Sequence, residues 1–499
     1  MKAILIWIAL LGALGWSTPK GDRGGEGFKE LTEQLADADP GKRRRAVRDL
    51  AKLGGREAWE HVIGALTDEK GEVADEAQYW LPGLDEDRLI SALFGREGLG
   101  SKDELLRMRV AEALGRFERP VDGEDLLKQV SRREPLVGEM LLWSVERLAR
   151  AGKLEGKPER CVRSLEKLVK GKGPAVLRAQ AACAMSALSP ERAQELLPKW
   201  SKDKAPELRR AALLCAMDLG LEGALDMGVK LRQDEVPFVR LAALDAIASG
   251  ENKRALELLV ERMVDEPRYR LKVACVEHLQ QLTGRKTKLN ATAWKGWVQS
   301  QAQDWTAPAR SKTPAEIGGT GTVSFAGLPI LSDRVCFLID FSGSLWYETE
   351  GRPPRKGKVD ELVRAALPRL PAGTQFNIMP YTGEPHPWRE QLVEASPRNV
   401  NQAVLDFEAN RVRGSGNVFD AVLLALQDPS TDRLVILTDG APTGGAHWRM
   451  ELMVPLLDQA TRFNGVAIDS LVIDARPGLR KLWFELSERT AGRALAVEL

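Results

Sequence analysis

The stretch Arg334-Val-Cys-Phe-Leu-Ile339 runs directly into the polar turn Asp340-Phe-Ser342-Gly-Ser344. Apolar residues follow the opening arginine, and Val, Phe and Ile favour extended backbone, so the pattern predicts a strand that is buried on both faces. The turn offers one carboxylate and two hydroxyls, with a glycine that relieves the bend. A buried strand that ends in such a turn indicates a functional site at the C-terminal edge of a parallel sheet.

Strands and helices alternate through the surrounding region, residues 329–499. A helical stripe of apolar residues covers 359–370. Further strand patterns lie at 375–379, 433–437, 466–473 and 494–497, and helical patterns lie near 398–409, 418–426, 448–463 and 478–489. This alternation predicts an α/β domain with a doubly wound, Rossmann-like parallel sheet and helices on both faces.

Another polar turn, Thr438-Asp439-Gly440, follows the strand at 433–437. Because parallel strands end at one edge of the sheet, this turn is expected to lie beside the first. Oxygen ligands with few carboxylates suit a hard divalent cation that keeps an open position, Mg²⁺ above all, with Mn²⁺ or Ca²⁺ as alternatives. A partner's carboxylate can fill that open position. The predicted metal ligands are Asp340, Ser342, Ser344 and Asp439.

These turns resemble the metal-ion-dependent adhesion site (MIDAS) of von Willebrand factor A-type (VWA) domains. The resemblance rests on Asp340-x-Ser342-x-Ser344, on Gly414-Ser-Gly-Asn417-Val-Phe-Asp420, and on Thr438-Asp439-Gly440, in the order that the family has. Alone, the first turn is also typical of a strand-to-helix cap, and the three turns together favour a metal site. The resemblance implies a domain that binds a protein ligand through one divalent cation.

One position departs from the family pattern. VWA domains place a threonine ligand in the second of these three turns, which here is 414–420 and is called the second turn below. Alignment on Asn417 and Asp420 puts Gly416 at the position of that threonine. Glycine has no side chain to coordinate a cation. Three alternatives stay open: the neighbouring Ser415 is the substitute ligand, the site is weaker, or it no longer binds metal. Ser415 is the fifth candidate ligand.

Aromatic residues are expected around the same edge of the sheet. Trp346 and Tyr347 follow the first turn, Trp388 lies in the connection after the second strand, and Trp448 follows the turn at Asp439. Aromatic side chains are frequent anchors in protein interfaces. We predict that they form an apolar rim that contacts the partner, and the alternative is that they pack inward as loop plugs.

Residues 28–300 have a different pattern, with leucine and alanine at helical spacing. The motif Asp203-Lys-Ala-Pro-Glu-Leu-Arg209 recurs as Asp234-Glu-Val-Pro-Phe-Val-Arg240 and Asp265-Glu-Pro-Arg-Tyr-Arg270, with the aspartates 31 residues apart. This period predicts an all-α helical-repeat solenoid whose Asp and Arg side chains bridge adjacent repeats. The pattern resembles HEAT-like repeats. Turn-forming residues without periodicity predict a linker at 301–328, so the chain is expected to be multidomain.

The N-terminus has the pattern of an export signal. Met1 and Lys2 precede an apolar run, Ala3 to Trp16, and a polar, glycine-rich segment follows. This length is typical of a signal-peptide core and is short for a membrane span. We interpret 1–17 as a signal peptide or an uncleaved N-terminal anchor, which places the protein in the periplasm, the cell envelope or outside the cell.

Composition narrows the function classes. Lys and Arg number 72 against 71 Asp and Glu, and this balance argues against nucleic acid as a partner. The four histidines form no ligand pair and no nucleophile–base grouping, so no catalytic residue or small-molecule substrate is evident. The sequence predicts a non-enzymatic, exported scaffold protein. The alternatives are a metal-dependent hydrolase and a VWA cofactor of an ATP-driven remodelling complex.

Overall fold

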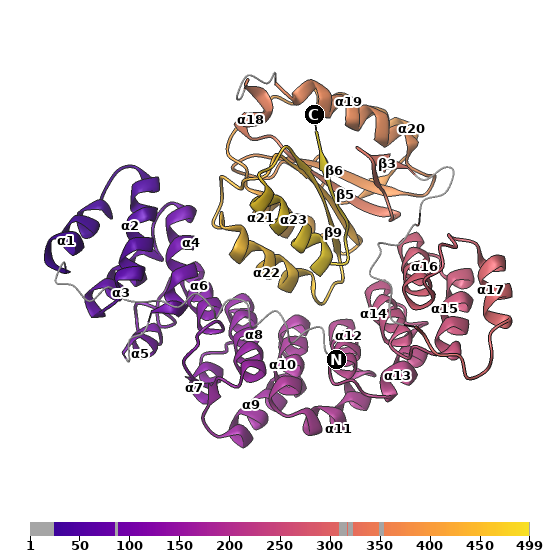
Figure 1. Ribbon diagram of the computed structural model, residues 1–499, viewed down its shortest axis with the longest axis horizontal. Coiled ribbons are helices and arrows are strands. Elements are labelled where there is room, and N and C mark those ends of the chain that lie inside the picture. Colours follow the sequence, from indigo (N-terminus) through magenta and orange to yellow (C-terminus); the bar gives the residue numbers. More distant parts are fainter. Residues whose placement is uncertain (1–23, 85–87, 309–316, 318–322, 349–353, 499) are drawn as a thin grey trace.

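The computed structural model describes residues 24–84, 88–308, 317, 323–348 and 354–498. The predicted signal peptide or anchor, 1–17, lies outside the described residues. Within them, no helix is both long and apolar enough to cross a membrane. The chain consists of a long helical part followed by an α/β part, which Figure 1 shows on the inner side of the curved helical array.

The helical part begins at Gly24 and ends at Gln299. Several helices start with proline, for example at Pro206 and Pro237, where the missing N–H leaves no hydrogen bond unmade. The helices are α1 Gly24–Gln34, α2 Pro40–Leu53, α3 Arg56–Ala65, α4 Gly71–Trp80, α5 Leu89–Leu93, α6 Glu104–Leu114, α7 Gly123–Lys128, α8 Pro135–Ala151, α9 Pro158–Lys170, α10 Ala175–Leu188, α11 Pro190–Trp200, α12 Pro206–Asp218, α13 Gly223–Leu231, α14 Pro237–Ala248, α15 Lys253–Asp265, α16 Tyr269–Thr283 and α17 Ala291–Gln299. Helices α4, α6, α8, α10, α12, α14 and α16 pack one on the next along the inner side of the array (Figure 1). Two short segments, β1 Val121–Asp122 and β2 Leu154–Glu155, pair in parallel between repeats.

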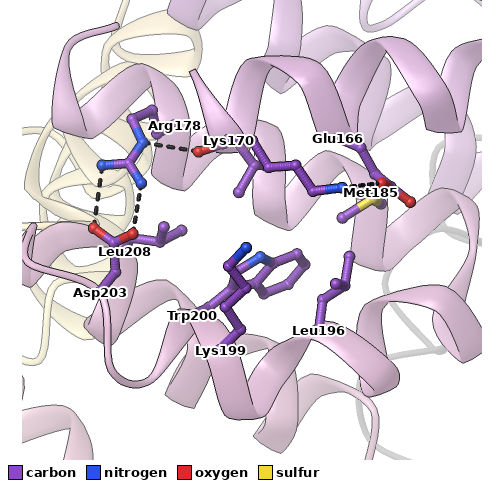
Figure 2. Close-up of a pocket in the computed structure, with 10 residues that line it drawn as sticks. Glu166, Lys170, Arg178, Met185, Leu196, Lys199, Trp200, Asp203 and Leu208 are labelled. Atoms are coloured by element: carbon purple, nitrogen blue, oxygen red, sulfur yellow. Dashed lines mark hydrogen bonds and ion pairs between the residues drawn. The ribbon is translucent and has the colours of Figure 1, made fainter. Parts of the chain in front are cut away.

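Arginines of the repeat motif bind the acidic residue of the next repeat. Arg209 donates to both carboxylate oxygens of Asp234, each at 2.7 Å. Arg178 binds Asp203 in the same way at 3.1 and 2.6 Å, as Figure 2 shows. The same forked contact joins Arg43 to Asp68 and Arg240 to Glu266. The predicted bridges between repeats are therefore confirmed for Asp203 and Asp234, whereas in the third repeat Glu266 accepts in place of the predicted Asp265. Each bridge fixes the position of a helix relative to its neighbour.

The α/β part contains one main sheet, with the strand order β10-β9-β8-β5-β6-β7. The first five strands in that order are parallel to their neighbours, and β7 is an antiparallel edge strand that the sequence pattern did not reveal. The strands are β5 Arg334–Asp340, β6 Gln375–Tyr381, β7 Val393–Glu394, β8 Arg433–Thr438, β9 Ala467–Ile473 and β10 Ala494–Val497. A separate pair is formed by β3 Ser324–Phe325 and β4 Leu328–Pro329. The helices are α18 Gly343–Trp346, α19 Lys356–Ala366, α20 Pro397–Ala409, α21 Val418–Ala425, α22 Met450–Thr461 and α23 Pro477–Arg489.

Helices cover both faces of this sheet, as the sequence predicts. On β5, Val335 and Phe337 belong to one apolar cluster with residues of α19 and α20. The alternate residues Cys336 and Leu338 belong to another, with residues of α21, α22 and α23. Because side chains alternate along a strand, the run of apolar residues fills a core on each side. The doubly wound α/β fold is thereby confirmed.

Helix α22 also packs against the helical array. Leu452, Leu456 and Phe463 from this region belong to the same apolar cluster as the array's buried leucines and alanines. Polar contacts surround this seam: Arg462 donates to both carboxylate oxygens of Glu146 at 2.7 and 2.9 Å. The α/β part is therefore docked on the inner helices through a mixed apolar and charged interface.

Two buried arginines of the inner helices, Arg109 of α6 and Arg270 of α16, contact the α/β part. Arg109 donates to the carbonyl oxygen of Ala446, and Arg270 donates to that of Gly465 at 2.6 Å. Arg109 also bridges two repeats, because its Nη1 donates to Asp75 of α4 at 2.6 Å. For Arg270 the predicted bridge between repeats is wrong, since this side chain donates to backbone carbonyl oxygens of the α/β part. The docked α/β part offers carbonyl oxygens where a neighbouring repeat would offer a carboxylate.

Some of the described residues of the predicted linker, 301–328, are packed, while others, such as 302–304, are exposed. Trp305 meets Trp297 edge to face, with ring centroids 6.2 Å apart. Ile317, Phe325 and Leu328 are all buried. The division of the chain into domains joined by a linker at 301–328 stays a prediction.

Candidate functional site

Asp340 is the last residue of β5, and its carboxylate lies at the C-terminal edge of the sheet. Its side chain is fixed by two hydrogen bonds: Oδ1 accepts from the Ser342 amide at 2.9 Å, and Oδ2 accepts from the Thr438 hydroxyl at 3.0 Å. The residue is 6% exposed. Thr438 ends the neighbouring strand β8, so the hydrogen bond from its hydroxyl ties the two polar turns together.

The hydroxyls of the first turn lie close to each other. Ser342 Oγ and Ser344 Oγ are 3.2 Å apart, on the turn that leads into α18. Ser342 also forms an isolated parallel bridge with Gly414, which brings the second polar turn to the same edge. The structure therefore gathers all three turns that the sequence singled out.

The negative charge of Asp439 acts on the carboxyl group of Asp340. Burial, and next the negative charge of Asp439, raise the pKa of Asp340 from 3.8 to about 6. No described residue forms an ion pair with Asp340. Asp439 has a distant cationic neighbour, Arg355, whose Nη1 is 3.7 Å from its carboxylate, while Nη2 is 3.1 Å from Asp474. A buried carboxylate without a cation costs free energy, and a bound cation would offset that cost.

These donors fit a hard divalent cation. Two carboxylates and two hydroxyls at one edge form an oxygen set that leaves room for water or for a ligand from a partner, as Mg²⁺ prefers. Among the described residues, no three His, Cys, Asp or Glu side chains cluster as a metal site. A cation here would therefore depend on the hydroxyls of Ser342 and Ser344 as much as on carboxylates.

The second turn has space where a side chain is missing. A methyl group built on Gly416 would lie 3.4 and 3.5 Å from the two carboxylate oxygens of Asp340, at ordinary van der Waals contact. The Ser415 hydroxyl lies elsewhere, against the backbone: methyl groups built on Gly444 and Gly383 would lie 2.5 and 3.2 Å from it. The position that corresponds to the family's threonine thus faces Asp340, and Ser415 faces the neighbouring loops.

The aromatic residues divide into separate groups. Trp346 packs edge to face on Phe341, with centroids 5.7 Å apart, and Tyr347 is 58% exposed beside the first turn. Trp448 is half-buried, and its indole N–H donates to the carbonyl oxygen of Gly445 at 3.0 Å.

Trp388 lies away from Trp346 and Tyr347. Its amide donates to the carbonyl oxygen of Ile378, and its ring stacks on Phe376 near the start of β6, with centroids 5.7 Å apart. The connection after β6 folds back along that strand, so Trp388 is carried away from the edge that holds Asp340. The structure does not bring the four predicted rim residues into one surface.

The loop that follows Asp439 is held by the helical part, a contact that the sequence did not reveal. Asp75 of α4 accepts hydrogen bonds from the amides of Trp448 and Arg449 at 2.6 and 2.8 Å. The same buried carboxylate contacts His447 Nδ1 at 2.9 Å and Arg109 Nη1 at 2.6 Å. Burial acts to raise the pKa of Asp75, but the contacts with His447 and Arg109 outweigh it and hold this pKa at about 2.

Comparisons with known proteins connect part of the chain to VWA domains. Over 134 residues it is 34% identical to inter-alpha-trypsin inhibitor heavy chain 4 of Mus musculus, covering 24% of this chain and 13% of that protein. Over 141 residues it is 27% identical to the human von Willebrand factor A domain-containing protein 3B, covering 28% of this chain and 10% of that protein. No family model matches the chain.

Among solved structures, a von Willebrand factor type A protein from Catenulispora acidiphila is 18% identical, with a TM-score of 0.28, covering 34% of this chain and 39% of that one. The chain spans less than one seventh of the length of the two sequence relatives. It is homologous to VWA domains over part of its own length, and that homology concerns a domain and not the whole protein.

Proposed function

We propose that residues 329–499 form a VWA domain that binds one divalent cation, Mg²⁺ in the first instance, and uses it to hold a partner protein. The observation that carries this proposal is the buried Asp340 carboxylate, which faces Asp439 and the serine hydroxyls without a cation of its own among the described residues. Asp340, Ser342, Ser344 and Asp439 hold the cation in this proposal. A carboxylate of the partner completes its coordination, because Mg²⁺ favours oxygen ligands and the protein supplies few of them.

The helical array is a HEAT-like scaffold in this proposal, and the protein has no enzymatic activity of its own. Support comes from the Arg–Asp bridges between repeats and from the inner helices, which hold the α/β part against the array. Repeat arrays with such continuous packing are suited to presenting a docked domain. Export is proposed on the apolar run Ala3 to Trp16.

Titration calorimetry with Mg²⁺ tests the cation site. Asp340→Asn keeps the size of the side chain, and Thr438 can reverse its hydrogen bond because a hydroxyl both donates and accepts. We expect the wild type to bind Mg²⁺ and to melt at a higher temperature in its presence, and the variant to do neither. Asp406→Asn, an exposed carboxylate on α20, is the matched control and should behave as the wild type. A wild type that binds no Mg²⁺, or a variant that binds it equally, would overturn the proposal.

A further inference from the structure

The second turn lacks the hydroxyl that the VWA pattern places there, and the loop after Asp439 carries a threonine at the same spot. We propose that Thr443 supplies the missing hydroxyl ligand to the divalent cation, in place of a side chain at Gly416. This inference rests on the proposed cation site. It assigns to Thr443 a role that neither the family pattern nor the sequence motifs give it.

The geometry places Thr443 beside the empty position. A methyl group on Gly416 would lie 3.5 Å from the Thr443 hydroxyl oxygen and 3.4 Å from Asp340 Oδ1. The space that a threonine at residue 416 would occupy is therefore bordered by the Asp340 carboxylate and by the Thr443 hydroxyl.

Two hydrogen bonds hold Thr443 against the second turn. The Gly416 amide donates to Thr443 Oγ1 at 2.8 Å, and the Thr443 amide donates to the Gly416 carbonyl oxygen at 3.1 Å. A hydroxyl oxygen has two lone pairs, and the Gly416 amide uses one of them. The second lone pair is available to a cation, and the hydroxyl hydrogen is available to a carboxylate of a partner. Thr443 is exposed, so its hydroxyl can be reached from solvent.

The loop that carries Thr443 is also held from the other side. Asp75 accepts the amides of Trp448 and Arg449, a few residues further along. The position and orientation of Thr443 are thus set before any cation binds. A preorganised ligand loses less conformational entropy when the cation binds. Ser415 has no comparable placement, because its hydroxyl faces Gly444 and Gly383.

Gly416 also permits a reciprocal test. Its φ is not in the left-handed region, and a methyl group there meets its neighbours at 3.4 Å or more, so a threonine can be introduced without backbone strain. Thr443→Val removes the hydroxyl with little change of shape, and Gly416→Thr restores a hydroxyl from the family's own position. The double variant then separates loss of a ligand from damage to the loop.

Mg²⁺ affinity is measured by calorimetry, and melting temperature is measured with Mg²⁺ and with chelator. Thr443→Val should weaken Mg²⁺ binding by on the order of tenfold or more, as removal of a metal-site partner typically does. Thr443→Ser and Ser415→Ala should bind as the wild type, and Thr443→Val with Gly416→Thr should regain most of the affinity. Equal melting temperatures in chelator show that the loop is intact.

Two results would overturn the inference while leaving the cation site in place. One is wild-type affinity in Thr443→Val when Asp340→Asn binds no Mg²⁺. The other is a loss of affinity in Ser415→Ala with none in Thr443→Val, which would make Ser415 the ligand. Wild-type binding by Asp340→Asn would instead refute the cation site itself, so the two failures are distinguishable.

Discussion

Replacing Asp75 by asparagine is expected to destabilise the protein and to release the loop at 445–449 from the helical part. Asp75 is fully buried and accepts from four donors, among them the guanidinium of Arg109, whose side chain is 1% exposed. Asparagine keeps the shape but removes the negative charge. Asparagine also replaces one carboxylate oxygen by an NH2 group. That donor would face a backbone N–H of the loop, which is a donor too.

The magnitude follows from the charge that is lost. The pKa of Asp75 falls from 3.8 to about 2 in the folded protein, and this shift corresponds to about 2 kcal/mol in favour of the ionised form. Loss of one partner of a buried ion pair typically costs about 3–5 kcal/mol, because the other charge stays buried and unpaired. We therefore expect Asp75→Asn to lower the free energy of unfolding by about 3 kcal/mol.

Urea denaturation measures this loss, and hydrogen exchange locates it. The amides of Trp448 and Arg449 should exchange faster in the variant, since both donate to Asp75. Asp234→Asn is the matched control: it breaks the forked bridge to Arg209 within the array, so it should lower stability without changing exchange at 448 and 449. Unchanged stability together with wild-type exchange of those two amides would refute the reasoning.

Three further outcomes are expected. The stability difference between the wild type and Asp75→Asn should shrink below about pH 4 and be lost only below about pH 2. A lowered folded-state pKa contributes stability above the unfolded-state value, and that stability is lost as pH falls through the folded-state pKa. Denaturation of Arg209→Met should show a loss on the order of 2 kcal/mol, since Asp234 keeps its charge with no forked partner, and stability equal to the wild type would make the bridges dispensable. The pair Leu10→Asp and Leu11→Asp should hold the chain in the cytosol in a fractionation experiment, and normal export would exclude the leader.

The strand at Arg334–Asp340 was predictable because the residues that determine it are adjacent in the sequence. A strand buried on both faces needs apolar residues at every position, and the turn after it displays its donors in the sequence itself. The bridges between repeats were predictable for a related reason, since a fixed period repeats the same contact along the chain. Both features can be identified without knowing how distant segments meet.

The remaining features depend on contacts between distant segments. Asp75 and Trp448 are 373 residues apart, and Gly416 and Thr443 are 27 residues apart, with no motif that links either pair. Trp388 was expected at the metal edge because it follows a strand that ends there, yet the chain reverses and runs back along β6. Tertiary packing decides which loop fills a gap and in which direction a connection turns. Short sequence patterns do not contain that information.

The docked α/β part also has a mechanical consequence for the array. Stacked repeats behave as a spring, because small rotations between neighbours add up to a large change in curvature. Here the α/β part forms hydrogen bonds with four residues of the inner helices, on α6, α8, α12 and α16. These residues are Arg109, Glu146, Arg210 and Arg270. Pulling the ends of the array apart must break these contacts before the repeats can open. The α/β part therefore braces the inner side of the array, and the bending stiffness of the array depends on this docked part.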